Sequence, residues 1–311
     1  MTEPNTTCLP PTETSFSYSD TNHRNECTRI SFTGFSIYSV TLLICLLGLL
    51  GNGMVLWFFG FCIQRNPFTV YILNLGMADF GFLLLLAVFL TTEMVNILNC
   101  FHLDLSLFAL LFLFTYNTSL YLLTAISIER CLAVFFPLWC QCHCPKHLSA
   151  IVCFLLWVLS SLLIGLVHYF CVSSVTAKCP MTFLPMHILN LLICIPIMVL
   201  SSVTLSIKVQ CCSQQRQQRK LYAIILLIVL FFLLFAIPLS IQLFAVYFSY
   251  AFFSIEICFT LASINSSSNP FIYFLVGSYK KRQFRGSVKV VLQAVFEEKA
   301  DTRETHREDQ C

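Results

Sequence analysis

An acid and a base stand side by side near the end of a long apolar stretch. The segment SLYLLTAISIERCLAVFFP covers residues 119–137, and Glu129 and Arg130 are its charged residues. A neighbouring carboxylate and guanidinium can form a structural ion pair, belong to a proton path, or contact a signalling partner. The residue types alone leave these three roles open.

A second charge lies in an apolar run on its own. Asp79, in NLGMADF, is near the middle of residues 68–92. If that run crosses a membrane, an isolated carboxylate costs about 2.5–3.5 kcal/mol, so we expect it to face other helices and find partners. Polar residues at similar depth in other runs are Asn52, Ser119, Asn265, Ser266 and Asn269. Hydroxyl and amide oxygens around one acid suit a small hard cation such as sodium. A neutral, hydrogen-bonded aspartic acid that joins helices is the equal alternative.

The elements that must position these residues are apolar helices. The chain is 58% hydrophobic and 11% charged, with a mean hydropathy of +0.81, and a soluble domain of 311 residues would carry more charge. Each apolar run is about as long as the roughly 20 helical residues that cross a bilayer. The runs are continuous rather than alternating, which favours helices over barrel strands. The predicted fold is an all-α membrane protein, a seven-helix bundle with runs at 33–60, 68–92, 103–128, 148–170, 184–207, 221–247 and 252–276.

The distribution of cations orients the bundle. Lys and Arg are sparse at 1–34 and in the segments on that side, and dense on the other side, including RQQRK at 216–220 and the tail from Lys280. Because basic loops stay cytoplasmic, we expect an extracellular amino terminus in the plasma membrane. The net charge of +3 then reflects a basic inner collar near anionic lipids, not nucleic-acid binding. The predicted organisation is an outer tail (1–32), the bundle (33–276), an amphipathic helix on the inner leaflet (277–296) and a disordered tail (297–311).

Three prolines lie inside the last three runs. Pro196, Pro238 and Pro270 each remove a backbone hydrogen bond and permit a kink. A static bend in the helix would explain each proline on its own. Three in consecutive helices beside a polar core favour inner ends that can move.

An ordered set of motifs, one to each run, resembles the rhodopsin-like G-protein-coupled receptors. The set consists of GN at Asn52, NLGMAD at Asp79, ERC at 129–131, Trp157, the three prolines, and NPFIY at 269–273. The resemblance covers residues 33–296. RNPFTVYILNL, LYLLTAISIERCLAV, CPKHLSA and SSSNPFIYFLVGS are further similar to the Mas and Mas-related receptors.

This resemblance implies a ligand-activated receptor with a heterotrimeric G protein and arrestin as partners and no organic cofactor. It implies a G-protein contact and inner switch at Glu129, Arg130, Cys131, Asn269, Pro270 and Tyr273. It also implies a pocket for an allosteric sodium ion at Asp79, Ser119, Asn265, Ser266 and Asn269.

Several positions depart from the wider family. Leu105 stands where the wider family has a cysteine, 25 residues before Arg130. Ala236 in FAIP replaces a tryptophan, and Thr204 replaces a tyrosine. A Cys171–Cys179 bridge would close a short outer hairpin without strain, a pairing that the Mas-related resemblance also implies, with free thiols as the alternative. Asn5, in NTT, is a candidate glycosylation acceptor.

The ligand class is narrowed mainly by exclusion. The seventh run has no lysine for a retinal Schiff base, and Phe112 stands where amine receptors have an aspartate. The outer acids Glu93, Asp104 and Glu256 could attract a cationic peptide or small base, although each is also explained as ordinary loop charge. Phe112, Tyr116 and His168 are further candidate ligand contacts.

Other function classes find less support. The sequence has no Ser/His/Asp or GxSxG arrangement, and CQCHC at 140–144 lacks zinc-ligand spacing, so we expect no enzyme. A transporter or channel with Asp79 as the ion-coupling site is the alternative, but no inverted repeat is evident.

The positions of the acidic residues predict whether the protein signals without a bound ligand. No Asp or Glu occurs between Glu129 and Glu256, and the foot of the sixth run reads QQRQQRK. An acid there, which many receptors use to tie Arg130 to the sixth helix, is therefore missing. We expect appreciable signalling in the absence of ligand.

Overall fold

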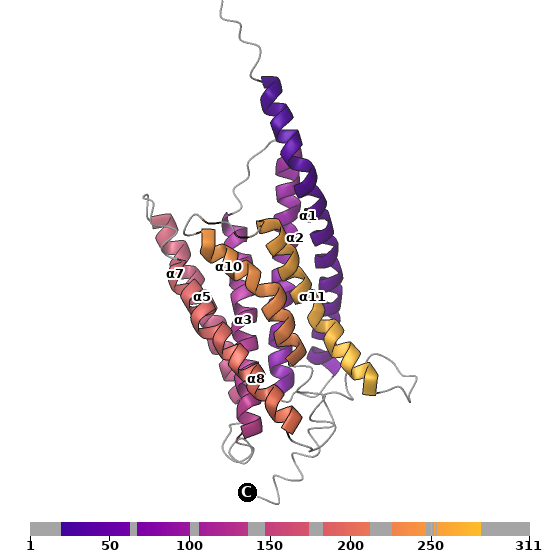
Figure 1. Cartoon of the computed structure of the whole chain (residues 1–311), viewed down its shortest axis with the longest axis vertical. Helices are drawn as coiled ribbons and strands as arrows, with labels where there is room; N and C mark the ends of the chain where they lie inside the picture. Colours follow the sequence, from indigo (N-terminus) through magenta and orange to yellow (C-terminus); the bar gives the residue numbers. More distant parts are fainter. Residues whose placement is uncertain are drawn as a thin grey trace, which may run out of the picture.

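The protein is a bundle of long, roughly parallel helices (Figure 1). The computed structural model describes the backbone of residues 20–62, 67–99, 106–135, 147–173, 183–211, 226–246, 250, 252 and 254–280. Side chains are described for 34–61, 67–96, 106–133, 135, 147–170, 183–207, 226–245, 250, 252 and 254–273.

Four helices form the first half of the bundle. α1 covers Asp20–Trp57 and continues as the π-helix η1, Phe58–Cys62; α2 covers Pro67–Asn99, α3 Ser106–Phe135 and α5 Leu148–Ser173. Two compound helices follow. Span five consists of α7 (Leu184–Ile188), the π-helix η2 (Leu189–Cys194) and α8 (Ile195–Cys211). Span six is helical at 226–231 and continues as the π-helix η3 (Phe232–Ala236) and α10 (Ile237–Val246). The last helix is α11, Ile255–Lys280.

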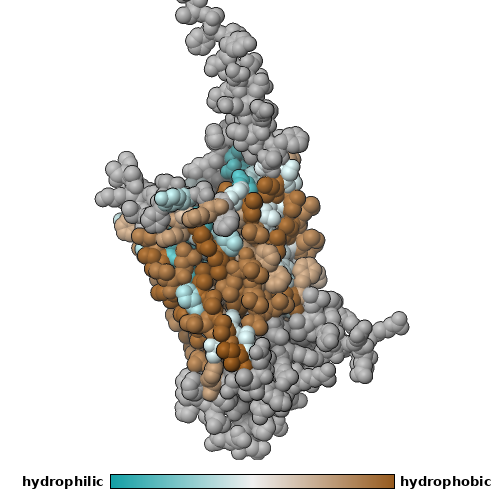
Figure 2. All heavy atoms as spheres, viewed as in Figure 1, coloured by the Kyte–Doolittle hydropathy of each residue, from teal (hydrophilic) through white to brown (hydrophobic). Residues whose placement is uncertain are grey.

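The outer surface of the bundle is apolar over its middle. Figure 2 shows this hydrophobic band on one face of the bundle. Exposed apolar side chains of the described helices include Leu47, Phe154, Leu162, Leu192 and Leu200. Within the described residues, six helical segments are long and apolar enough to cross a membrane. α11 is more polar because it carries the Asn and Ser residues of INSSSN, yet its 26 residues would extend about 39 Å. The sequence thus correctly predicts a helical membrane bundle.

α1 and α11 approach closely at a glycine. α1 packs against α2 and α11, while α3 packs against α2, α5 and α8. A Cβ atom at Gly48 would overlap the Ser267 hydroxyl, which donates to the Ile44 carbonyl at 3.1 Å. Asn52 Nδ2 adds a second link by donating to the Ser266 carbonyl at 3.0 Å. These contacts fix α11, and with it the NPFIY segment, against α1.

Two of the span prolines directly follow π-helical segments. The Ile195 N–H donates to the Asn190 carbonyl at the end of η2, and the Ile237 N–H donates to the Phe232 carbonyl at the end of η3. Pro196 and Pro238 come next in the chain. Because a proline ring lacks an N–H and clashes with the carbonyl four residues back, a wider turn relieves the conflict. The sequence predicted the disrupted backbone at both prolines but not its π-helical form.

Candidate functional site

The Glu129–Arg130 pair lies near the end of α3, and the end of the bundle that carries it is called the inner end below. Arg130 Nη2 lies 3.2 Å from Glu129 Oε1, so the adjacent residues form a local ion pair. The Arg130 side chain is buried, whereas Glu129 is partly exposed. Cys131 donates from its thiol to the Ser201 carbonyl of α8 at 3.3 Å and so joins α3 to span five.

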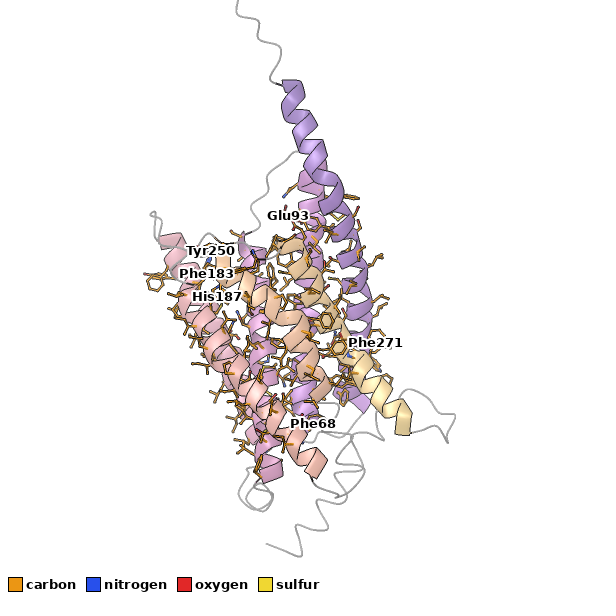
Figure 3. The ribbon with its side chains drawn as sticks, in the orientation of Figure 1. Phe68, Glu93, Phe183, His187, Tyr250 and Phe271 are labelled. Atoms are coloured by element: carbon orange, nitrogen blue, oxygen red, sulfur yellow. The ribbon has the colours of Figure 1, made fainter. Side chains whose placement is uncertain are left out.

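An aromatic ring from another helix covers Arg130. The guanidinium carbon lies 4.2 Å from the centroid of the Phe68 ring, in the first turn of α2, which is a cation–π geometry. Phe68 also lines a small apolar cavity with residues of α3, span six and α11, including Leu123, Ile228 and Tyr273. Figure 3 shows Phe68 at the inner end. Sequence reasoning missed this residue because a phenylalanine in an apolar run carries no special signal.

The predicted polar core forms around Asp79. Its carboxylate is completely buried and accepts bonds from Ser119 Oγ at 2.9 Å and from Asn269 Nδ2 at 2.7 Å. Ser266 makes a third contact to the same carboxylate. α2, α3 and α11 therefore meet at one buried acid, which satisfies the requirement for partners.

The donor set around Asp79 fits a small hard cation. Asn269 Oδ1 and Asn265 Oδ1 are buried and have no hydrogen-bond donor among the described residues. Asn269 contacts the Asp79 carboxylate directly, whereas Asn265 lies one turn before it on α11 and makes no hydrogen bond with Asp79 in the described part of the chain. Amide oxygens are a ligand type that sodium takes. The same geometry also fits a neutral aspartic acid that joins three helices, so both interpretations of Asp79 stand.

Two of the outer acids lie at the opposite end of the bundle, each within electrostatic range of the same tyrosine. Glu93 of α2 and Glu256 of α11 are both close enough to Tyr38 of α1 to interact with it electrostatically. Both carboxyl-bearing residues are partly exposed, and Ser254 Oγ donates to Glu256. Figure 3 shows Glu93 at the end of the bundle away from Phe68. A cation at this end would meet negative charge from two helices.

The aromatic candidates lie deeper than these acids. Phe112 is buried, with ring centroids 5.5 Å from Phe259 and 5.7 Å from Phe89. Tyr116, one turn further along α3, is also buried, and its hydroxyl bonds to span six. His168 is exposed on α5, so it lies at the surface of the bundle and not in its interior.

The remaining predicted site residues fall outside the described part of the chain. Asp104, Cys179 and Asn5, and the side chain of Cys171, are among them. The predicted inner-leaflet helix at 277–296 also lies outside it beyond Lys280, where α11 ends.

A buried polar cluster between α3 and span five was not foreseen. Asn190 Nδ2 donates to Asn117 Oδ1 at 2.6 Å, and Asn117 Nδ2 donates to Met186 Sδ at 3.0 Å. His187, next to Met186, is buried and packs against Phe183 and Phe244. The sequence gives no signal for this pairing, because Asn117 and Asn190 lie in different apolar runs, 73 residues apart.

Comparison with known proteins decides the family. Residues 51–273 match the family described as "7 transmembrane receptor (rhodopsin family)". The chain is 40% identical to rat Mas-related G-protein coupled receptor member H over 96% of its own length and 95% of the relative's. The chain belongs to the Mas-related receptors of the rhodopsin family. Human Proto-oncogene Mas is 38% identical over 88% of the chain and 87% of the relative, and human Mas-related receptor member D is 40% identical over 84% and 85%.

The charged residues described above can now be placed along a receptor of this family. The receptor carries its buried Arg130 near the inner end of α3, Glu93 and Glu256 near the opposite ends of α2 and α11, and Asp79 between Phe68 and Glu93 on α2. The family consists of receptors and not of enzymes. The alternative of a transporter coupled through Asp79 therefore finds no support.

Proposed function

We propose that this receptor binds an extracellular peptide or small cationic or polar agonist and activates heterotrimeric G proteins through Arg130. The observation that carries the proposal is the position of Arg130. It is a permanently charged group, 3% exposed, at the inner end of a receptor-family bundle, held by the neighbouring Glu129 and the ring of Phe68. A buried guanidinium that is released when helices separate would offer a G protein a new charged contact.

We also propose that the receptor activates G proteins without a bound ligand. No carboxylate is available to Arg130 from the chain between Glu129 and Glu256, so spans four to six supply none. An exposed charge pair contributes about 0–1 kcal/mol, and its loss shifts a two-state equilibrium up to about fivefold. We therefore propose notable basal nucleotide exchange.

Further parts of the proposal concern the surroundings of the bundle. The amino terminus is extracellular, with Asn5 glycosylated and Cys171 bridged to Cys179, and the receptor resides in the plasma membrane. Residues 277–296 lie on anionic inner-leaflet lipids, and arrestin is a second inner partner. Sodium bound at Asp79 favours the closed inner end, a role supported by the spare amide oxygens of Asn265 and Asn269.

The outer acids support the choice of a cationic ligand. Glu93 and Glu256 come from helices that are distant in sequence yet share Tyr38 as a neighbour, so their fields add at one place. Asp104 would extend this negative field from outside the described residues. The deeper aromatic residues, Phe112 and Tyr116, would then line the inner boundary of the ligand site.

The test is guanine-nucleotide exchange by purified receptor in lipid vesicles. A panel of G proteins is combined with short basic peptides and, as controls, acidic peptides of equal length. We expect basic peptides to raise exchange, and Glu93→Gln with Glu256→Gln to weaken their potency about tenfold or more, since each lost charge contact contributes on the order of 1 kcal/mol. Glu256→Asp, which keeps the charge, is the matched control. Equal potencies in the Gln and wild-type receptors would exclude this ligand site.

A further inference from the structure

We propose that Tyr116 is the positioning residue that holds span six in the closed arrangement of the inner end, through hydrogen bonds at Ala236 and Ser240. The Tyr116 hydroxyl lies 2.8 Å from the Ala236 carbonyl oxygen and 2.7 Å from Ser240 Oγ. A phenol has one proton to donate, so when Tyr116 donates to the carbonyl, Ser240 donates to the phenol oxygen. One buried side chain of α3 thereby makes two hydrogen bonds to span six.

The two hydrogen bonds of Tyr116 reach span six at a point where that helix can bend. Ala236 ends the π-helix η3, and Pro238, two residues later, has no N–H to contribute to the helix. The regular helical hydrogen bonding of span six is therefore interrupted next to the residues to which Tyr116 bonds. A helix with a proline and a π-turn can bend there at low cost. A hydrogen bond at that point restrains the bend more than the same bond on a regular turn would.

The bonds belong to a closed arrangement of the inner end. Arg130 and Tyr273 are buried there, and Ile228 and Val229 of span six line the small apolar cavity beside them. Moving the lower part of span six outward would expose these side chains. Contacts that restrain span six in this arrangement therefore favour the closed state, and their loss favours the open one.

A continuous packing of rings leads from the outer acids to Tyr116. Phe89 lies one turn from Glu93 on α2, and Phe259 lies one turn from Glu256 on α11. Their ring centroids lie 5.7 and 5.5 Å from that of Phe112, respectively, and Phe82 packs against both Phe112, at 6.3 Å, and Tyr116, at 6.0 Å. A ligand that displaces Phe89 or Phe259 would act on Tyr116 through side chains already in contact. This part of the inference rests on the proposed ligand site.

The chain offers a matched control for the hydroxyl. Tyr121 lies on the same helix, is also buried, and its hydroxyl makes no hydrogen bond to any residue that the structure describes. Tyr116→Phe and Tyr121→Phe each remove one buried hydroxyl from α3 and keep the ring. Only the first removes the link to span six. Ser240→Ala tests the same link from the other helix and replaces Tyr116→Phe if that variant does not fold.

The first measurement is hydrogen–deuterium exchange of the purified receptor over residues 226–236, which requires neither ligand nor G protein. We expect Tyr116→Phe to raise deuterium uptake there about two- to tenfold, the change that follows from losing a buried hydrogen bond. Tyr121→Phe should match the wild type. Uptake that is equal in Tyr116→Phe and Tyr121→Phe would overturn the proposal.

The second measurement is ligand-free nucleotide exchange at matched receptor concentration. We expect a rise of about two- to tenfold for Tyr116→Phe. Adding Ser240→Ala should then change little, because Tyr116→Phe has already removed the bond between Ser240 and the phenol oxygen. The proposed restraint of span six by Tyr116 would be contradicted if the two substitutions had additive effects on ligand-free exchange. It would also be contradicted if Tyr116→Phe lowered that exchange. A wild type that activates no G protein would refute the proposed function, while deuterium uptake would still decide the role of Tyr116.

Discussion

At the scale of single residues, Arg130 combines two unlike restraints. The carboxylate of Glu129 is its neighbour in sequence, so their pair cannot tie α3 to another helix, whereas the ring of Phe68 belongs to α2. A cation–π contact that is shielded from water contributes up to about 2 kcal/mol, more than an exposed ion pair. Phe68 therefore links Arg130 to α2 in the closed arrangement.

We predict that Phe68→Leu raises ligand-free nucleotide exchange about two- to tenfold, because leucine keeps the apolar lining of the cavity but removes the ring face beneath the guanidinium. Phe68→Tyr keeps the ring and is the matched control, with exchange close to that of the wild type. The measurement is nucleotide exchange at equal receptor density. Identical exchange by the Leu and Tyr variants would show that the ring does not restrain Arg130.

Asp79 gives the second prediction at this scale. Replacing potassium chloride by sodium chloride at constant ionic strength should lower ligand-free exchange in the wild type, because the ion would add a bond to the closed arrangement. Asp79→Asn keeps the hydrogen-bonding shape and removes the charge, so the two salts should then give equal exchange. Equal exchange in the wild type itself would leave Asp79 as the neutral link between α2, α3 and α11.

At the scale of elements, the hydropathy pattern predicts much of the bundle. The runs at 148–170 and 184–207 begin where α5 and α7 begin, because the start of a membrane helix is set by the change from polar to apolar residues. The polar core could also be predicted, since Asp79 must find partners and few polar residues lie at its depth. The π-helices and the Tyr116–Ala236 hydrogen bond could not be predicted from the sequence. A backbone carbonyl acceptor has no signature in the sequence, and a tyrosine packs equally well in a core without a hydrogen-bond partner.

The contact between α1 and α11 gives a prediction about stability. Gly48→Ala should lower the free energy of unfolding by about 1–3 kcal/mol, because the added methyl overlaps the Ser267 hydroxyl and crowds Leu83. Gly165→Ala is the control: a Cβ there meets nothing within 4 Å, and alanine favours helix by about 1 kcal/mol. Thermal unfolding of the two purified variants checks this. A midpoint for Gly48→Ala equal to that for Gly165→Ala would contradict the close approach.

At the scale of the whole molecule, the charged side chains that the structure describes occupy a few positions along the axis of the bundle. Acids gather at one end beside Tyr38, a single acid lies in the polar core, and Arg130 lies at the other end. Between them the described core contains apolar side chains together with buried uncharged polar ones, and aromatic rings connect the outer acids to span six. A cationic ligand at one end and a G protein at the other would thus act on opposite ends of one restrained structure.

The most direct test of this account is ligand-free nucleotide exchange by the purified wild-type receptor and by Arg130→Ala, in vesicles of equal receptor content and across a panel of G-protein classes. We predict exchange above that of receptor-free vesicles for at least one class in the wild type, and a return to the receptor-free rate in Arg130→Ala. Full exchange by Arg130→Ala, or none by the wild type with any class even when basic peptides are present, would contradict the account.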